Sequence, residues 1–358
     1  MKKHLIILIL SSTLAVIFSD FTEEFLYRPS AMFMTFVSLG RLNSISLDQK
    51  GIPSVYSNRQ HSLDYNPVTT SLYALSYYEK FKKTKNEYNE YIEELNSLSD
   101  REYLNYFFNC ADWLVDQLKI YKYKNINYGV WEYNQRRPIY NLDTPWVSAL
   151  AQGLGIQVLG RAFVLTNNKK YLKSSETALN AFFVKVNNGG VTYMDDNNNW
   201  WYEEYAHPTG KVSRALNGMQ LVLIGFFEYY SISGNQKSKL LFDKGISGLK
   251  TNIQKYDAGW RTYYDILGTI ANKDYHKLHI SLLKKIFIIT KDPFFEKIAE
   301  KWSNYHEHYF IREFIKQKPN YHNITIMSFN VIGFFVISEI VFSLYAVCLK
   351  KVFKNELI

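Results

Sequence analysis

Apolar side chains recur every three or four positions in successive stretches between residues 66 and 305, with polar residues between them. The stretch 104–118 is the clearest example, because Leu104, Phe107, Leu114 and Leu118 fall on one face of a helix with 3.6 residues per turn. The pattern therefore predicts helices in this part of the chain. Eight helices are expected. The first starts at residue 67, and the others follow in chain order at 104–118, 146–163, 171–186, 216–230, 239–253, 275–289 and 295–305.

Capping residues followed by proline mark several expected helix starts. Asn66-Pro67, Thr144-Pro145 and Asp292-Pro293 each combine a side-chain acceptor with a residue suited to the first helical turn. Strand-like alternation is confined to hairpins between the helices. We therefore expect an all-α fold: an incomplete (α/α) toroid of paired helices with inserted β-hairpins, flanked by terminal hydrophobic segments.

Both ends of the chain are strongly apolar. Residues 1–19 have a basic start and an apolar run of about fourteen residues, which indicates a signal peptide or an uncleaved N-terminal anchor. Residues 324–349 contain fifteen Leu, Ile, Val and Phe residues. At roughly −0.3 to −0.6 kcal/mol each, these outweigh roughly +3 kcal/mol for Glu339, so a transmembrane helix is expected here.

Lysines lie at the outer end of each apolar segment, which places both chain ends in the cytoplasm by the positive-inside tendency. The chain is thus expected to be membrane-anchored, with residues 20–323 on the extracytoplasmic side, in the periplasm, at the cell surface or in a secretory lumen. The expected organisation is an N-terminal extension at 20–65, a catalytic domain at 66–310 and a cytoplasmic basic tail at 350–358.

The net charge of +9 changes this picture little. Without the charged residues of the terminal segments, 37 basic and 31 acidic residues remain, a mild net +6. No basic run alternates with aromatics in the manner of a nucleic-acid site, so nucleic acid is not an expected partner. The two cysteines are too few for a disulfide scaffold or a cysteine metal site.

Candidate chemistry is concentrated in residues 187–218. Two turn clusters bracket the runs 191–194 and 200–205, which predicts a β-hairpin whose second strand carries both acids and aromatics. Aromatic faces stack on sugars, glutamate and tyrosine act as acid and base, and Lys211 or Arg214 is placed to hold a carboxylate. An exposed hairpin with a solvated acidic pair fits the composition equally well.

Three motifs, in order, carry a family resemblance. They are Ser148-Ala149-Leu150-Ala151-Gln152-Gly153 with Arg161-Ala162, then Trp201-Tyr202-Glu203-Glu204-Tyr205 with Leu216-Asn217-Gly218, then Tyr264-Asp265 with Asp274-Tyr275-His276 and His279-Ile280. Together they resemble the catalytic domain of the D-glucuronyl C5-epimerases, which act on heparosan-type glycosaminoglycans. The resemblance covers residues 66–305 and implies the same toroid.

The resemblance also implies an active site without a cofactor or metal. We expect Tyr275 and the Glu204/Tyr205 pair on opposite faces of the sugar ring, assisted by Tyr264. His276 and His279 lie three residues apart, but no third metal ligand follows at suitable spacing, so a structural or substrate-contact role is expected. The expected substrate-binding residues are Gln152, Trp201, Tyr202, Glu203, Arg214, Asn217, Arg261 and His276.

Two features depart from the family pattern. Leu267 stands where the family has an arginine that helps to bind anionic substrate, and Arg261 is the expected replacement. The loop 264–275 is also shorter than in animal members. The leading hypothesis is a uronyl C5-epimerase acting on an acidic, uronate-containing polysaccharide at a membrane. A polysaccharide lyase and a non-catalytic glycan-binding protein remain alternatives, and the oligomeric state is open, a homodimer included.

Overall fold

The computed structural model describes residues 2–19, 21–22, 45–57, 62–82, 98–305 and 321–355. These residues fall in two compact units. One unit is Asn43–Tyr305, and the other combines the chain ends, Met1–Leu42 and His306–Ile358.

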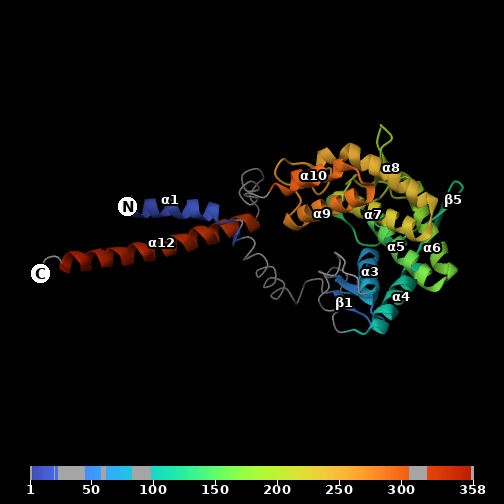
Figure 1. Ribbon diagram of the computed structural model, residues 1–358, viewed down its shortest axis with the longest axis horizontal. Coiled ribbons are helices and arrows are strands. Elements are labelled where there is room, and N and C mark those ends of the chain that lie inside the picture. Colours follow the sequence, from blue (N-terminus) through green and yellow to red (C-terminus); the bar gives the residue numbers. More distant parts are fainter. Residues whose placement is uncertain are drawn as a thin grey trace. The chain divides into compact units, whose positions relative to one another are not determined.

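Helices in the unit Asn43–Tyr305 pack as consecutive pairs. The pairs are α3 (Pro67–Lys82) with α4 (Asp100–Gln117), α5 (Ala149–Thr166) with α6 (Lys169–Asn180), α7 (Leu216–Ser233) with α8 (Gln236–Asn252), and α9 (Lys273–Thr290) with α10 (Pro293–Ser303). The first members also contact one another in succession, α3 with α5, α5 with α7, and α7 with α9. Figure 1 shows the resulting arc, which has the expected architecture of an incomplete (α/α) toroid.

Helices α5 and α7 are the centre of this arc. They approach so closely that a Cβ atom added to Gly153 would lie 3.3 Å from the Cα atom of Val222, and one added to Gly225 would lie 3.2 Å from the carbonyl oxygen of Gly153. Helix α5 is long and apolar enough to span a membrane, but 72% of it is buried by the neighbouring helices. It is therefore a core helix of the arc.

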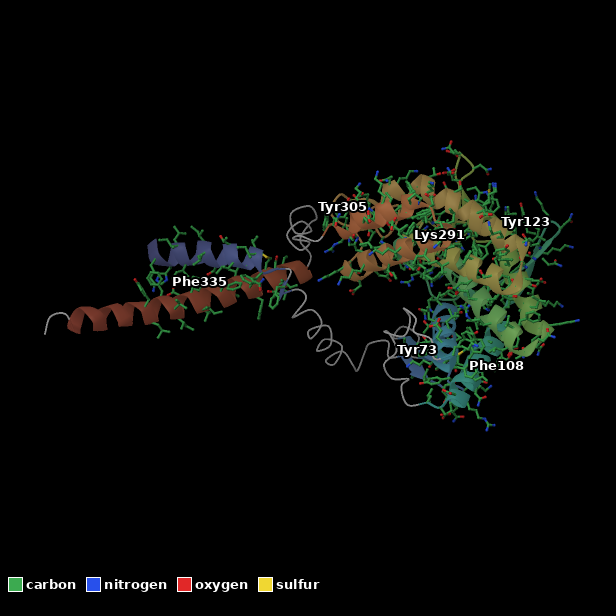
Figure 2. The ribbon with its side chains drawn as sticks, in the orientation of Figure 1. Tyr73, Phe108, Tyr123, Lys291, Tyr305 and Phe335 are labelled. Carbon is green, nitrogen blue, oxygen red and sulfur yellow. The ribbon has the colours of Figure 1, made fainter. Side chains whose placement is uncertain are left out.

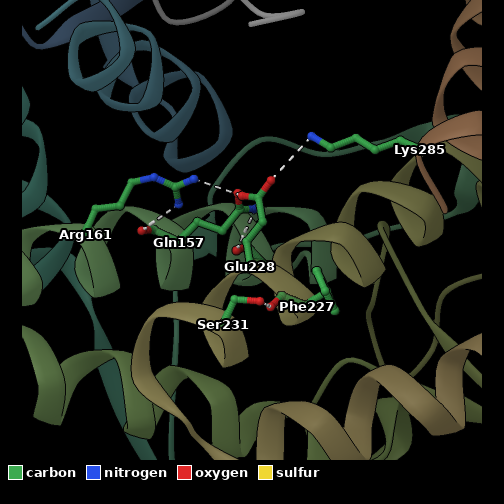
Figure 3. A network of polar contacts seen from close by, with 7 residues as sticks. Gln157, Arg161, Phe227, Glu228, Ser231 and Lys285 are labelled. Carbon is green, nitrogen blue, oxygen red and sulfur yellow. Dashed lines mark hydrogen bonds and ion pairs between the residues drawn. The ribbon is translucent and has the colours of Figure 1, made fainter. Parts of the chain in front are cut away.

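A network of charged side chains joins three inner helices (Figure 3). Glu228 of α7 accepts from Arg161 of α5 at 2.9 Å and from Lys285 of α9 at 3.3 Å. All three side chains are largely withdrawn from water, which screens such pairs less than at an open surface. The network ties α5, α7 and α9 into one curved layer.

Side chains fill the space between the paired helices, Tyr73 of α3 and Phe108 of α4 among them (Figure 2).

Helix ends follow local sequence rules. Ser99 and Glu102 form a complete capping box on α4, and Lys291, also labelled in Figure 2, ends α9 in the left-handed conformation at φ 57°.

The periodicity predicted all eight helices, but two boundaries were wrong. The third helix begins at Ala149, where the Ser148 hydroxyl accepts from Ala151 N, and not at Pro145. Trp146 instead lies in a strand that pairs with Tyr133. The fourth helix ends at Asn180 and gives way to 3-10 turns at Ala181–Phe183 and Val186–Asn188.

The described strands form small antiparallel sheets around the helices, as expected. They are β1 (Ile45–Leu47), β2 (Pro53–Ser57) and β3 (Ser62–Tyr65) in one sheet, and the pairs β4 (Lys119–Tyr123) with β5 (Ile126–Val130), β6 (Glu132–Tyr133) with β7 (Trp146–Val147), and β8 (Thr192–Met194) with β9 (Trp200–Tyr202). The β8–β9 pair is the hairpin predicted from the turn clusters, with a second strand that ends at Tyr202.

The second unit contains two helices that contact each other, α1 (Lys2–Ile17) and α12 (Tyr321–Asn355). Within α12, Ile324–Tyr345 is 22 residues long, apolar enough to cross a membrane, and only 11% buried. By length and composition this segment fits the expected span. Part of the expected N-terminal extension, residues 23–44, lies outside the described residues.

Candidate active site

Glu204 lies against the first turn of α7. A Cβ atom added to Gly218 would fall 2.3 Å from the Oε2 atom of Glu204 and 2.9 Å from its Cβ atom, so only a glycine leaves room for this carboxylate. The side chain is nearly buried, with 7% of its surface exposed. Because the N-terminal end of a helix carries partial positive charge, this position favours an anion.

Three tyrosines continue from this carboxylate. The hydroxyl oxygens of Tyr205 and Tyr264 lie 3.1 Å apart, and both hydroxyls lower the pKa of Glu204 against the effect of its burial. The rings of Tyr264 and Tyr275 meet edge-on with their centroids 4.9 Å apart. The structure thus brings the four predicted catalytic side chains into one cluster, with Tyr275, 38% exposed, at its outer end.

Backbone hydrogen bonds fix the two later tyrosines. Leu216 N at the start of α7 donates to the carbonyl oxygen of Tyr264 at 2.9 Å, which binds that loop to the helix beside Glu204. Tyr275 lies in the first turn of α9, where its backbone N donates to the Asn272 side chain at 2.8 Å. The start of α7 therefore positions Tyr264, and the N-cap of α9 positions Tyr275.

Burial sets the protonation states of the cluster. It raises the pKa of Glu204 to about 7, against hydrogen bonding from Tyr205 and Tyr264 and the positive charge of Arg137. Burial, together with the charge of Glu204, raises the pKa of Tyr205 and that of Tyr264 far above the ordinary value for tyrosine. Near neutral pH the carboxyl can hold or release a proton, while the phenols stay protonated.

Further aromatics surround Tyr205, and sequence reasoning missed them. Its ring centroid lies 4.6 Å from that of Tyr140 and 5.7 Å from that of Trp146, which itself stacks on Tyr133 at 4.1 Å. The guanidinium carbon of Arg137 lies 5.5 Å from the Tyr205 centroid. The signal was the density of rings and arginines in residues 131–146, where only the helix start at Thr144-Pro145 was predicted.

Trp201 and Tyr202 do not reach this cluster, so their predicted role in sugar binding is corrected. Trp201 is 1% exposed and stacks on Tyr256, with ring centroids 5.4 Å apart. Tyr202 is fully buried, and its hydroxyl donates to the carbonyl oxygen of Leu241 at 2.6 Å. The hairpin is covered by α7 and α8, so the faces of both rings serve the core.

Glu203 and Arg214 form a second polar contact away from the phenols. The buried carboxylate of Glu203 accepts from the Ser213 hydroxyl and from the backbone N of Arg214, each at 3.0 Å. The Arg214 guanidinium carbon lies 5.1 Å over the ring of Tyr193. Glu203 is therefore corrected to a role in holding the loop ahead of α7, while the substrate contact of Arg214 stays a prediction.

Two other predicted substrate contacts, Gln152 and Arg261, are also buried in structural networks. Gln152 donates to the carbonyl oxygens of Gly129 and Ala178 and accepts from Trp131 N. Arg261, 2% exposed, stacks over Trp260 with its guanidinium carbon 5.3 Å from the ring centroid. These two are corrected to positions that join loops to helices.

The histidine pair shares one hydroxyl. Thr262 Oγ1 lies 3.1 Å from His276 Nδ1 and 2.8 Å from His279 Nδ1. Burial lowers the pKa of His279 to about 3, so this ring is neutral. His276 is therefore corrected to a structural role. Among the described residues no group of three or more His, Cys, Asp or Glu side chains is arranged to hold a metal ion.

Asn217 is a predicted substrate contact that precedes the glycine against which Glu204 lies. It precedes Gly218 in the first turn of α7 and is 5% exposed. Its Oδ1 atom is buried without a hydrogen-bond partner in the structure, as is the Oε2 atom of Glu204. Two acceptors are thus left open at this end of α7.

The structure is an arc of helical hairpins, with a buried carboxylate among phenols at the start of an inner helix. These features define the class of this protein as an (α/α)-toroid with an acid–base site. Comparison with known proteins narrows the class. A family model described as D-glucuronyl C5-epimerase C-terminus matches residues 124–304. The chain belongs to this family.

Two curated relatives are similar over about half of the chain. A D-glucuronyl C5-epimerase of Caenorhabditis elegans is 37% identical over 223 residues, which are 56% of this chain and 34% of that protein. An uncharacterized protein of Methanocaldococcus jannaschii is 33% identical over 182 residues, which are 50% of this chain and 58% of that protein. The chain therefore spans from a third to somewhat over half of the length of these relatives.

Two solved structures are similar to this chain at low sequence identity. An α-mannanase of glycoside hydrolase family 76 from Bacteroides thetaiotaomicron is 12% identical, with a TM-score of 0.43 over 85% of this chain and 73% of that one. A D-mannose isomerase is 13% identical, with a TM-score of 0.43 over 84% and 77%.

Proposed function

We propose that this protein is a uronyl C5-epimerase, which converts D-glucuronate to L-iduronate residues within a polysaccharide. The observation that carries the proposal is the buried carboxyl of Glu204, with a pKa near 7, beside protonated phenols. Family membership supports the same reaction class. An acidic polysaccharide is the substrate class that fits the reaction, and the mild net charge of +6 outside the terminal segments is compatible with it.

The reaction requires a base, an acid and no oxidant. Glu204 takes the proton from C5, and the electron pair of that C–H bond moves into the neighbouring carboxylate. A tyrosine hydroxyl then gives its proton to the opposite face of C5, and the electron pair returns to form the new bond. Tyr275 is the donor that we assign, because it lies beyond Tyr264 at the outer end of the cluster and is 38% exposed, so that its hydroxyl regains a proton from water.

The pH dependence follows from the raised pKa of Glu204. The base must be ionised, so kcat/KM for glucuronate polymer should fall about tenfold for each pH unit below about 7 and level off above it. Initial rates between pH 5 and pH 9 measure this profile. A profile that stays flat down to pH 5 would contradict a buried carboxylate as the base.

Product analysis tests the proposal against its rivals. An epimerase yields iduronate while chain length stays constant. A lyase uses the same carbanion to expel the substituent at C4, so it shortens the chains and creates an ultraviolet-absorbing double bond. A non-catalytic binding protein leaves both chain length and C5 configuration unchanged. Size analysis with NMR of one reaction separates the three outcomes.

We further propose that both apolar ends hold the protein in a membrane, with residues 20–323 on the extracytoplasmic side. Contacts between α1 and α12 support it. Glu339 in the apolar part of α12 contacts Lys3 at 3.1 Å and His4 at 2.7 Å, and the Asn330 side chain donates to the Ala15 carbonyl oxygen at 3.3 Å. Polar groups inside a membrane need such partners.

Small buried residues on α1 suit a helix contact in lipid. Ser11 and Ala15 of α1, and Ser19 just beyond its end, are fully buried and recur every four residues, the spacing that lets two membrane helices approach closely. We therefore expect α1 to remain in the mature protein as a partner for α12. Mass spectrometry of full-length protein purified from membranes should recover peptides from residues 2–19, and a mature N-terminus beyond residue 19 would contradict the helix pair.

A further inference from the structure

A cation is missing from the position where family resemblance would place it. Leu267 stands there and is 52% exposed. Arg261, the expected replacement, is buried over Trp260, and its Nη1 atom faces the carbonyl oxygen of Ala271 at 3.5 Å. Neither residue puts a positive charge beside Glu204. An enzyme that delocalises charge into a carboxylate needs a cation for it.

Arg137 supplies a cation from a different segment. Its guanidinium carbon lies 5.5 Å from the centroid of the Tyr205 ring, and its positive charge lowers the pKa of Glu204 against the effect of burial. The residue itself is exposed. A guanidinium that rests on an aromatic face keeps its planar fork available for a carboxylate.

A closed turn holds Arg137 in this place. Its backbone N donates to the carbonyl oxygen of Leu142, and Leu142 N donates back to the carbonyl oxygen of Arg137, both at 3.1 Å. Pro138 begins the turn, and Asn141 ends it in the left-handed conformation at φ 53°. The backbone on which the guanidinium is mounted is therefore fixed at both ends.

The same turn is joined to the loop that carries Tyr264. The Tyr140 hydroxyl donates to the carboxylate of Asp265 at 2.9 Å, and the Tyr140 ring packs on Tyr205 with centroids 4.6 Å apart. Tyr140 is 4% exposed, so this link is within the protein. The turn thereby fixes Arg137 relative to two of the phenols.

We propose that Arg137 binds the carboxylate of the uronate residue that reacts, and so selects uronate over neutral hexose. The inference rests on the proposed epimerase function for the identity of the substrate. A carboxylate accepts two hydrogen bonds from the guanidinium fork and stays paired while charge accumulates on it. The hydroxymethyl group of a neutral hexose offers no such partner.

Arg136 provides a matched control. It precedes Arg137, is exposed, and its Nη2 atom pairs with Asp143 at 2.8 Å. A change at Arg136 removes the same charge one residue away from the proposed contact. Full-length Arg137→Gln, Arg137→Lys and Arg136→Gln proteins are therefore compared with wild type on a glucuronate polymer and on the same polymer with its carboxyl groups reduced to alcohols.

Arg137→Gln should lower both the affinity for the glucuronate polymer and kcat/KM by about 10- to 100-fold, the range of a charged hydrogen-bonded pair, and leave binding of the reduced polymer unchanged. Arg137→Lys keeps the positive charge but lacks the planar guanidinium that makes two parallel hydrogen bonds. Its affinity and kcat/KM for the glucuronate polymer should lie between those of wild type and Arg137→Gln. Arg136→Gln should stay within about twofold of wild type. Equal effects of Arg137→Gln and Arg136→Gln would overturn the assignment.

The two measurements separate this inference from the function on which it rests. If wild type prefers the glucuronate polymer and Arg137→Gln loses that preference, the carboxylate contact stands even where no epimerisation is seen. If wild type epimerises and Arg137→Gln retains full affinity and rate, Arg137 has no such contact and the proposed function survives. If wild type does not distinguish the two polymers, the inference is wrong.

Discussion

Replacing Glu204 by glutamine should reduce C5 proton exchange by about 10³-fold, within the range of 10² to 10⁴ attributed to general acid–base catalysis. The amide has nearly the same shape, so it fits beside Gly218, but it cannot accept the C5 proton. Exchange is measured by NMR at saturating glucuronate polymer in deuterated water. Activity within about threefold of wild type would exclude Glu204 as the base.

The same variant should gain stability at high pH. The pKa of Glu204 is about 7 when folded against 4.5 for the ordinary group, so the folded protein holds the proton more tightly than the unfolded chain. Wild type therefore loses stability as pH rises from 4.5 through 7, and the loss persists above that. The variant lacks this carboxyl, so its free energy of unfolding should exceed that of wild type at pH 8 by at most about 3 kcal/mol and should equal it near pH 4. Unfolding in denaturant at both pH values measures the difference.

Glu203 is the matched control, because it is adjacent and equally buried. Its oxygens accept from the Ser213 hydroxyl and from the backbone N of Arg214. In a Glu203→Gln variant the side-chain NH₂ group would face one of these donors, and that hydrogen bond would be lost. We expect a loss of about 1–3 kcal/mol in stability and nearly normal exchange per folded molecule. Equal loss of activity in both variants would show that the two carboxyls are not distinct in role.

Replacing Tyr275 by phenylalanine should lower iduronate formation by about 10²-fold and leave the fold intact. The ring contact with Tyr264 survives, since only the hydroxyl is removed. Glu204 can still remove the C5 proton and return a deuteron to the same face. The variant should therefore label glucuronate at C5 without inverting it, which NMR detects as deuterium in residues that keep the glucuronate configuration.

Tyr121 offers the comparison for this variant, because it is an exposed tyrosine on the separate β4–β5 hairpin. Tyr121→Phe should keep the wild-type ratio of label to inversion. If Tyr275→Phe keeps that ratio as well, the proton donor on the opposite face is another residue.

Local periodicity was sufficient to predict the helices, because most of them bury an apolar face and several carry their own side-chain N-caps. The errors arose where tertiary contacts override local signals. Thr144-Pro145 resembles a helix start, but Trp146 gains more from pairing with Tyr133 in β6–β7 and from stacking on that ring. The family motif likewise led us to expect Trp201 and Tyr202 at the sugar site, whereas α7 and α8 cover both rings.

The four predicted catalytic residues were recognised through motifs, and the structure brings them together. Arg137 could not be found that way, because its relation to Tyr205 is set by a turn 68 residues earlier in the chain. The pKa of Glu204 was also beyond the sequence, since it follows from burial against the first turn of α7. Motifs identify reactive groups, while packing decides their charge and their neighbours.

The most direct test of the epimerase proposal is to incubate the full-length protein with glucuronate polymer in deuterated water and to follow C5 by NMR. The account predicts deuterium at C5, new iduronate signals and unchanged chain length, all lost in the Glu204→Gln protein. Shortened chains with ultraviolet absorbance, or no label on a glucuronate polymer that the protein binds, would contradict it.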